Sequence, residues 1–170
     1  TNESGLVAFA GLSVDRSGTK ILSASNGTPA AAEEDGGGKR LNTSHQQLAL
    51  VFSSPFTVSA GAAFELAFEQ QPSAIVSGAN ITPAVTVHVR DMLGNDVAGA
   101  AVTLSLVGSG TLSGALAATS NNSGLATFTA LSVDLAGPRY LNASSGTLGP
   151  ASSSLFVVAA AAITRIAPTI

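Results

Sequence analysis

Hydrophobic and polar residues alternate in short stretches along most of this chain, and helical periodicity is rare. In AVTVHVRD (residues 84–91), every second residue is valine, and threonine, histidine and arginine fill the positions between. Such alternation places one set of side chains on each face of a β-strand. The stretches FELAF (64–68) and VTLSL (102–106) repeat the pattern. We therefore expect strands with one buried and one solvent-facing side.

Turn-forming segments such as GANITP, LGND, GSG and NNSG separate these stretches. Together the two patterns predict seven strands, near residues 63–69, 84–91, 101–107, 110–117, 124–133, 138–144 and 152–160. Seven short strands in about 100 residues are typical of an immunoglobulin-like domain. The expected fold class is all-β, an immunoglobulin-like antiparallel β-sandwich.

The segment DLAGPRY has two interpretations. Tyr140 follows a turn containing Gly137 and Pro138. This arrangement is typical of a tyrosine corner, in which the hydroxyl bonds back to upstream backbone. Alternatively, Tyr140 is simply half-buried on a strand, and the sequence does not decide between the two.

The chain also contains an internal repeat. Residues 2–18 (NESGLVAFAGLSVDRSG) match residues 121–137 (NNSGLATFTALSVDLAG) at ten of seventeen positions, with an offset of 119. Residues 53–58 (SSPFTV) match residues 153–158 (SSLFVV) with an offset of 100. The first copy therefore carries 19 additional residues (119 − 100), between about residues 28 and 51. The repeating unit is about 100 residues long.

This repeat divides the chain into three parts. Residues 1–61 are expected to be the last three strands of one unit with an insertion at about 28–51, and residues 62–160 a complete unit. Residues 161–170 are expected to be the first strand of a following repeat or a donated strand. Three strands without partners leave an open edge and half a core. Neighbouring units of a longer chain, or another subunit adding strands head-to-tail in a filament, are expected to complete them.

The composition narrows the possible functions. Only 10% of the residues are charged, against about 25% in average soluble domains, and 45% are hydrophobic. The net charge of −3 argues against nucleic-acid and acidic-lipid partners. The absence of cysteine excludes disulfides and thiolate sites. The longest apolar run, Leu155–Ile163, is about half of the roughly 20 residues that a membrane-spanning helix needs.

Asparagine is concentrated in N-glycosylation motifs. Six of the eight asparagines begin an Asn-x-Ser/Thr sequon: Asn2, Asn26, Asn42, Asn80, Asn121 and Asn142. One interpretation is that these carry N-glycans on an extracellular surface. The other is that asparagine and serine or threonine co-occur because both favour turns. Asn2 and Asn121 occupy the same position of the repeat, just before the GLxxF strand.

Other candidate chemistry is sparse. In RDMLGND, Asp91, Asn95 and Asp96 offer oxygen ligands for Ca²⁺, but a hairpin turn explains the same residues without metal. His45 and His88 are the only histidines, and no carboxylate pattern accompanies them in sequence. Nothing resembles a Gly-x-Ser-x-Gly nucleophile motif. No catalytic residue, metal site or cofactor is expected, and an enzyme is disfavoured.

The insertion holds the one dense charge cluster of the chain: Glu33, Glu34, Asp35, Lys39 and Arg40. It is either a solvated flexible loop or an arm that contacts a neighbouring subunit. Its last residues, QQLALVF, have the composition of an additional strand.

The complete unit resembles the bacterial immunoglobulin-like repeats that occur in tandem in surface adhesins of the invasin and intimin type. The residues that carry this resemblance are Pro72 after the first strand, VRDMLGNDVAGA (89–100), and a GLATF strand leading into LSVDLAG (124–137). The resemblance implies the fold and tandem extracellular use, and it supplies no catalytic residues.

These observations favour a structural subunit of an extracellular glycosylated fibre or surface appendage, assembled by domain packing or strand complementation. The alternative is a stalk or spacer segment of a large multi-repeat cell-surface adhesin. Expected partners are further copies of the chain head-to-tail or neighbouring repeats, with covalent N-glycans, no nucleic acid and no membrane insertion. The expected location is extracellular or at the cell surface.

Overall fold

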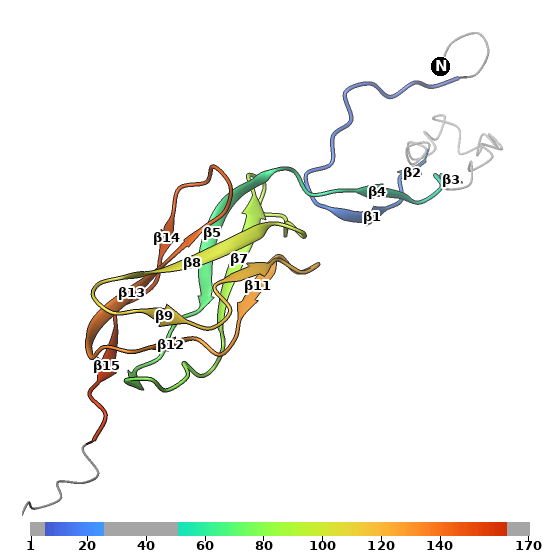
Figure 1. Cartoon of the computed structure of the whole chain (residues 1–170). Helices are drawn as coiled ribbons and strands as arrows, with labels where there is room; N and C mark the ends of the chain where they lie inside the picture. The colour runs from blue at the N-terminus through green and yellow to red at the C-terminus, as the bar shows by residue number, and fades with distance from the viewer. Residues whose placement is uncertain (1–5, 26–50, 163–170) are drawn as a thin grey trace, which may run out of the picture. The chain divides into compact units, whose positions relative to one another are not determined.

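Residues 63–159 form two β-sheets that enclose one hydrophobic core (Figure 1). The computed structural model describes residues 6–25 and 51–162, and every helix or strand assigned within these ranges is a β-strand. The strands within residues 63–159 are β5 (Ala63–Gln70), β6 (Ile75–Val76), β7 (Val85–Asp91), β8 (Ala101–Val107), β9 (Leu112–Ser113), β10 (Ala117–Thr119), β11 (Leu125–Phe128), β12 (Ser132–Val133), β13 (Gly137–Ser144), β14 (Ala151–Ser152) and β15 (Phe156–Ala159).

The strand order is that of an immunoglobulin-like domain. One sheet has the order β11-β7-β5, and the other has the order β10-β8-β13-β15-β6, with β14 also paired to β13. The strands β5, β7 and β11, which are the first, second and fifth of the seven predicted strands, thus share one sheet. The strands β8, β13 and β15, from the third, sixth and seventh predicted strands, share the other. A short β9–β12 pair lies apart from both, and β6 joins β15 in parallel. The predicted all-β sandwich is confirmed.

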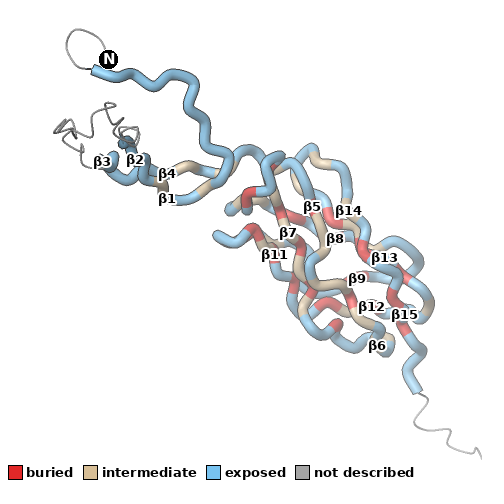
Figure 2. Tube along the Cα trace, turned by 180° about the vertical axis from the view of Figure 1, so that it is seen from behind, coloured by how far each residue is buried: buried red, intermediate tan, exposed pale blue. Residues whose placement is uncertain are grey.

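The core follows the alternation seen in the sequence. The valines of β7 are buried and the residues between them are half-exposed. Buried residues from β7 and β11 pack in one cluster with those from β8, β13 and β15, and Figure 2 shows them distributed along these strands. Burial of aliphatic area at about 25 cal/mol per Å² makes this cluster the main source of stability.

Two predicted strands are interrupted where the backbones approach closely. The predicted strand 124–133 divides into β11 and β12 because Ala130 has a φ of 54°. The strand predicted at 110–117 divides into β9 and β10 around Gly114. A Cβ on Gly114 would lie 2.3 Å from the carbonyl oxygen of Ala130. Only glycine therefore fits at this crossing.

The predicted strand 152–160 divides into β14 and β15 at Ser153. The Ser153 hydroxyl accepts a hydrogen bond from the Leu141 amide at 2.9 Å, while the Ser153 amide donates to the Leu141 carbonyl at 2.8 Å. A side-chain oxygen here replaces a backbone carbonyl in the ladder, so the strand register is broken. The two-residue strand β6 was not predicted, because two residues are too short for an alternating pattern to appear.

The buried residue of the DLAGPRY corner is Arg139 rather than Tyr140. Tyr140 is 43% exposed, and within the described ranges no hydrogen bond of its hydroxyl is present. The Arg139 guanidinium donates to the carbonyls of Leu135, Ala136 and Pro138 at 3.1, 3.0 and 2.7 Å. Tyr140 is therefore a strand residue, as the second interpretation has it, but it is exposed and not half-buried.

Residues 17–59 form a second unit, of which 17–25 and 51–59 are described. Its strands are β1 (Gly18–Lys20), β2 (Ser23–Ala24), β3 (Val51–Phe52) and β4 (Phe56–Val58). The pairs β1–β4 and β2–β3 are antiparallel. Residues 51 and 52, at the end of the QQLALVF stretch, lie in β3; the rest of the insertion lies outside the described residues.

We expect Phe128→Ala to lower the free energy of unfolding by about 3–5 kcal/mol, because the fully buried Phe128 side chain leaves a cavity in the core. The matched control is Phe9→Ala at the equivalent position of the repeat, where the side chain is 68% exposed. This change should cost less than about 0.5 kcal/mol. Urea unfolding of both variants measures the difference, and equal effects would contradict the assigned core.

Candidate functional site

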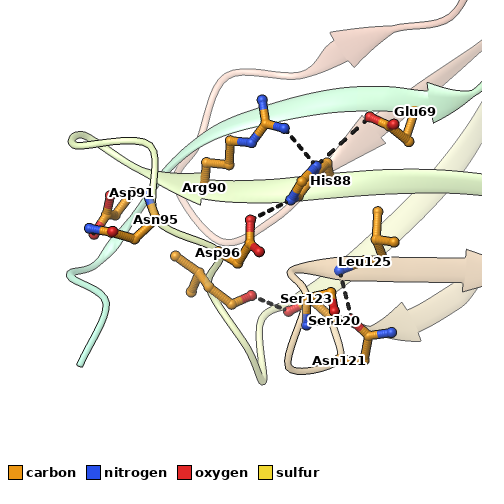
Figure 3. Close-up of polar contacts among 11 residues, drawn as sticks. Glu69, His88, Arg90, Asp91, Asn95, Asp96, Ser120, Asn121, Ser123 and Leu125 are labelled. Carbon is orange, nitrogen blue, oxygen red and sulfur yellow. Dashed lines mark hydrogen bonds and ion pairs between the residues drawn. The ribbon is translucent and has the colours of Figure 1, made fainter. Parts of the chain in front are cut away.

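Among the residues that the structure describes, the carboxylate with the most hydrogen bonds is that of Asp91, at the end of β7, which organises the β7–β8 turn (Figure 3). Its Oδ1 accepts the backbone amides of Leu93 and Asn95 at 2.9 and 2.8 Å. Its Oδ2 accepts the Gly61 amide at 2.8 Å and the Asn95 side-chain amide at 2.9 Å. Four N–H groups thus surround one carboxylate, which ties this turn to the backbone just before β5.

These donors lower the pKa of Asp91 from 3.8 to about 2, the Asn95 side chain contributing most and the Gly61 amide next. Hydrogen bonds to the ionised form favour that form. The same bonds decide between the two interpretations of RDMLGND. Both oxygens of Asp91 face N–H donors, so the turn interpretation accounts for the geometry of the carboxylate without a cation. Across residues 6–25 and 51–162, no group of three histidine, cysteine or acidic side chains is arranged to hold a metal ion.

A second polar cluster surrounds His88 on the outward face of β7 (Figure 3). The His88 Nε2 lies 2.7 Å from the Asp96 carboxylate, and its Nδ1 lies 3.0 Å from the Arg90 guanidinium. Because arginine only donates, Nδ1 accepts and Nε2–H donates to Asp96 in the neutral ring. Glu69 is 3.8 Å from Nδ1. Both ring nitrogens are engaged, which suits a cross-strand link and leaves no lone pair for a metal or a substrate.

No carboxylate pattern accompanies His88 in sequence, but the structure places the Asp96 carboxylate against its ring. Asp96 lies eight residues after His88 in the sequence. The turn at Asp91 folds the chain back, so that Asp96 forms an isolated antiparallel β-bridge with Arg90 and its carboxylate reaches the His88 ring. The available signal was the turn sequence LGND, which returns the next residues alongside the end of β7. Alternation on β7 had already placed residues 88 and 90 on one face.

Three of the six sequons fall within the described residues, and their surroundings differ. Asn80 is exposed and forms an isolated β-bridge with Ser132, and Asn121 is exposed at the start of a turn, whereas Asn142 is half-buried on the central strand β13. Asn121 Oδ1 accepts the amides of Ser123 and Leu125 at 2.9 and 3.1 Å (Figure 3). Only the side-chain oxygen of Asn121 accepts these bonds. A glycan attached to its side-chain nitrogen is therefore compatible with the turn. Asn142 Oδ1 accepts the Ser152 hydroxyl at 2.8 Å.

Other predicted features lie outside the described residues. These are Asn2, Asn26, Asn42, His45 and the charged cluster of the insertion. No helix among the described residues has the length and hydrophobicity to cross a membrane.

Comparison with known proteins gives likenesses of structure alone. No family model and no curated protein matches the chain. The D00–D0 domain of intimin is 21% identical with a TM-score of 0.44, over 65% of this chain and 56% of that one. Domains 4 and 5 of the S-layer protein SbsC are 17% identical with a TM-score of 0.40, over 65% and 63%. A glycosyl hydrolase family 2 member from Bacteroides cellulosilyticus is 20% identical with a TM-score of 0.45, over 64% and 16%.

The chain thus spans little more than half of the intimin structure. Intimin is of the adhesin type that the sequence resemblance indicated. Likenesses at this level carry no argument on function. The assignment of the fold therefore depends on the strand order and register described above.

We expect the stability of the chain to fall as the pH decreases from about 4 to about 2. The folded pKa of Asp91 is lowered, so its ionised form contributes stability above its ordinary pKa of 3.8, and this contribution is lost as the pH falls toward about 2. Asp91→Asn should lower the melting temperature at pH 7 and flatten the acid slope, because an amide NH₂ would face backbone N–H groups. Melting curves between pH 2 and 7 measure both effects. Glu65→Gln, at an exposed position of β5, is the control; an unchanged slope in Asp91→Asn would exclude this role.

Proposed function

We propose that the chain is a structural subunit of an extracellular, N-glycosylated fibre or surface appendage, built from immunoglobulin-like repeats. The observation that carries the proposal is the complete sandwich of residues 63–159, in which the sequon asparagines Asn80 and Asn121 are exposed. The polar clusters around Asp91 and His88 support it, because their hydrogen bonds join strands and turns. An enzymatic function has no comparable support.

The path of the chain through the sandwich suits an end-to-end array. Ala63 at the start of β5 pairs with Asp91, while Ala159 at the end of β15 pairs with Val76. The chain enters this sandwich at one end and leaves it at the opposite end (Figure 1). A domain of this kind adds its full length to a series of repeats, as a spacer requires. The same observation supports the alternative, a stalk segment of a multi-repeat adhesin.

The low charge of the chain is consistent with a surface covered by glycans. At 10% charged residues, hydroxyl and amide side chains supply most of the polarity. N-glycans at Asn80 and Asn121 would add solubility at positions that already face solvent. We include Asn2, Asn26, Asn42 and Asn142 in the proposal, with the lowest occupancy at Asn142, since its amide lies within the paired sheet.

Expression through a eukaryotic secretory pathway tests the glycans. Enzymatic removal of N-glycans should reduce the intact mass toward 16.7 kDa. Ser123→Ala and Thr82→Ala each destroy one sequon while leaving the asparagine in place, and each should remove the mass of one glycan. Ser144→Ala is the matched variant for Asn142 and should remove the least. An intact mass that does not change on deglycosylation would refute the proposal of N-glycans.

Electron microscopy of the purified native material tests the fibre itself. The fibre predicts ordered filaments with a regular repeat. Monodisperse monomers at high concentration would contradict it. A native polypeptide far longer than this chain on a denaturing gel would instead favour the adhesin stalk.

A further inference from the structure

The second unit repeats the hydrogen-bond pattern of β13, β14 and β15. In β1–β4, Gly18 opposes Val58 and Lys20 opposes Phe56; at the repeat offsets of 119 and 100, Gly137 opposes Val158 and Arg139 opposes Phe156. The pair β2–β3 matches β13–β14 in the same way. Two strand pairs thus keep one register across both offsets.

Side-chain hydrogen bonds are repeated as well. The Leu22 amide donates to the Ser53 hydroxyl at 3.0 Å, as the Leu141 amide donates to the Ser153 hydroxyl at 2.9 Å. The Lys20 ammonium donates to the Ser17 carbonyl at 3.0 Å, the position of the bond from Arg139 to Ala136. Residues 17–25 and 51–59 therefore fold as the last hairpin of the repeat.

What differs is burial. Leu22 is 46% exposed and Phe56 is 37% exposed, whereas their equivalents Leu141 and Phe156 are 0% and 3% exposed. Leu141 is covered because residues 62–120 supply the opposite side of the core. The segment that precedes β1 in the chain shows the same contrast in burial. Its residues Phe9, Leu12 and Val14 are exposed, and their equivalents in β11, the β11–β12 connection and β12 are buried: Phe128, Leu131 and Val133.

We propose that the hairpin of β1 to β4 is the second half of an immunoglobulin-like domain, and that its apolar face binds the first half of a further repeat, a segment with the strand pattern of residues 62–120. This partner is the one through which the proposed structural subunit would assemble. The inference rests on the proposed function in one respect, which is that the repeat is the building unit.

The pairing of β13 specifies how the partner binds. β13 pairs antiparallel with β8, with Leu141 opposite Leu106 and Ala143 opposite Leu104. Among residues 6–25 and 51–162, the other edge of β1 and β2 pairs with no strand. By the repeat offset, this edge accepts a strand like AVTLSLV antiparallel, with its leucines opposite Leu22 and Ala24. The edge of β4 corresponds to that of β15, where Val158 pairs in parallel with Ile75. A short β6-like strand therefore fits there.

Exchange of strands with a second copy of residues 1–170 does not cover the hairpin. In residues 62–160, β8 lies between β10 and β13, and β7 lies between β5 and β11. Each copy therefore contains one first half, already paired, and two second halves. Exchange of strands among identical copies always leaves one second half per copy uncovered.

The experiment compares the 170-residue chain with an extended chain that carries a copy of residues 62–120 before Thr1. Both are made unglycosylated, so the test of the glycans has no bearing on the result. The extended chain should lose binding of an apolar fluorescent dye and gain a second calorimetric unfolding transition. An extension with aspartate at the copied positions of Val87 and Leu104 should neither reduce dye binding nor add a second unfolding transition. Dye binding and a calorimetric profile unchanged by the intact extension would overturn the proposal.

Substitutions in the hairpin keep the proposal testable if the extended chain aggregates. In the 170-residue chain, Leu22→Asp should leave the melting temperature unchanged, whereas Leu141→Asp should abolish cooperative unfolding. In a soluble extended chain, Leu22→Asp should remove the added transition. If Leu22→Asp destabilises the 170-residue chain as strongly as Leu141→Asp, the face is already covered and the proposal is wrong. A dimer in sedimentation equilibrium that Leu22→Asp dissociates would also overturn it, in favour of a second copy.

Discussion

The structure depends on the burial of alternate aliphatic side chains between two sheets, with β13 at the centre. On one edge β13 pairs with β8, and on the other with β14 and β15. Its inward residues 139, 141 and 143 are all buried. A one-residue shift of this strand would move every one of them to the solvent face, so the register is strongly determined. The turns then have to return each strand in that register, which explains the hydrogen-bonded side chains of Asp91, Asn121 and Ser153.

Alternation and turn composition were sufficient to predict the main strands of the complete domain. Valine at every second position of β7 left little choice about its buried face, and the turn LGND placed the end of that strand correctly. The breaks in the later strands were not predictable, because they depend on contacts between distant residues. Glycine is required at position 114 only because the Ala130 carbonyl lies against it. Ser153 interrupts its strand only because its hydroxyl accepts a hydrogen bond from the Leu141 amide.

The polar sites show the same limit. The turn interpretation of Asp91 was available from the sequence, since aspartate and asparagine around glycine favour turns. The His88 cluster required a further step from the same turn, because Asp96 reaches the ring only after the chain reverses at LGND. Arg139 lies within the predicted strand 138–144, and the sequence gives no sign that it is buried. Its burial depends on three carbonyls of its own turn, which no pattern of hydrophobic positions indicates.

The central claim is that one repeat occurs in two conditions, covered in β13 and uncovered in β1 and β2. Hydrogen exchange of the 170-residue chain, resolved to individual amides, tests it most directly. The amides of Leu141 and Leu22 donate to equivalent serine hydroxyls. We expect Leu141 to exchange only through global unfolding, and Leu22 to exchange at least about a hundredfold faster through local opening. Equal protection of the two amides would contradict the account.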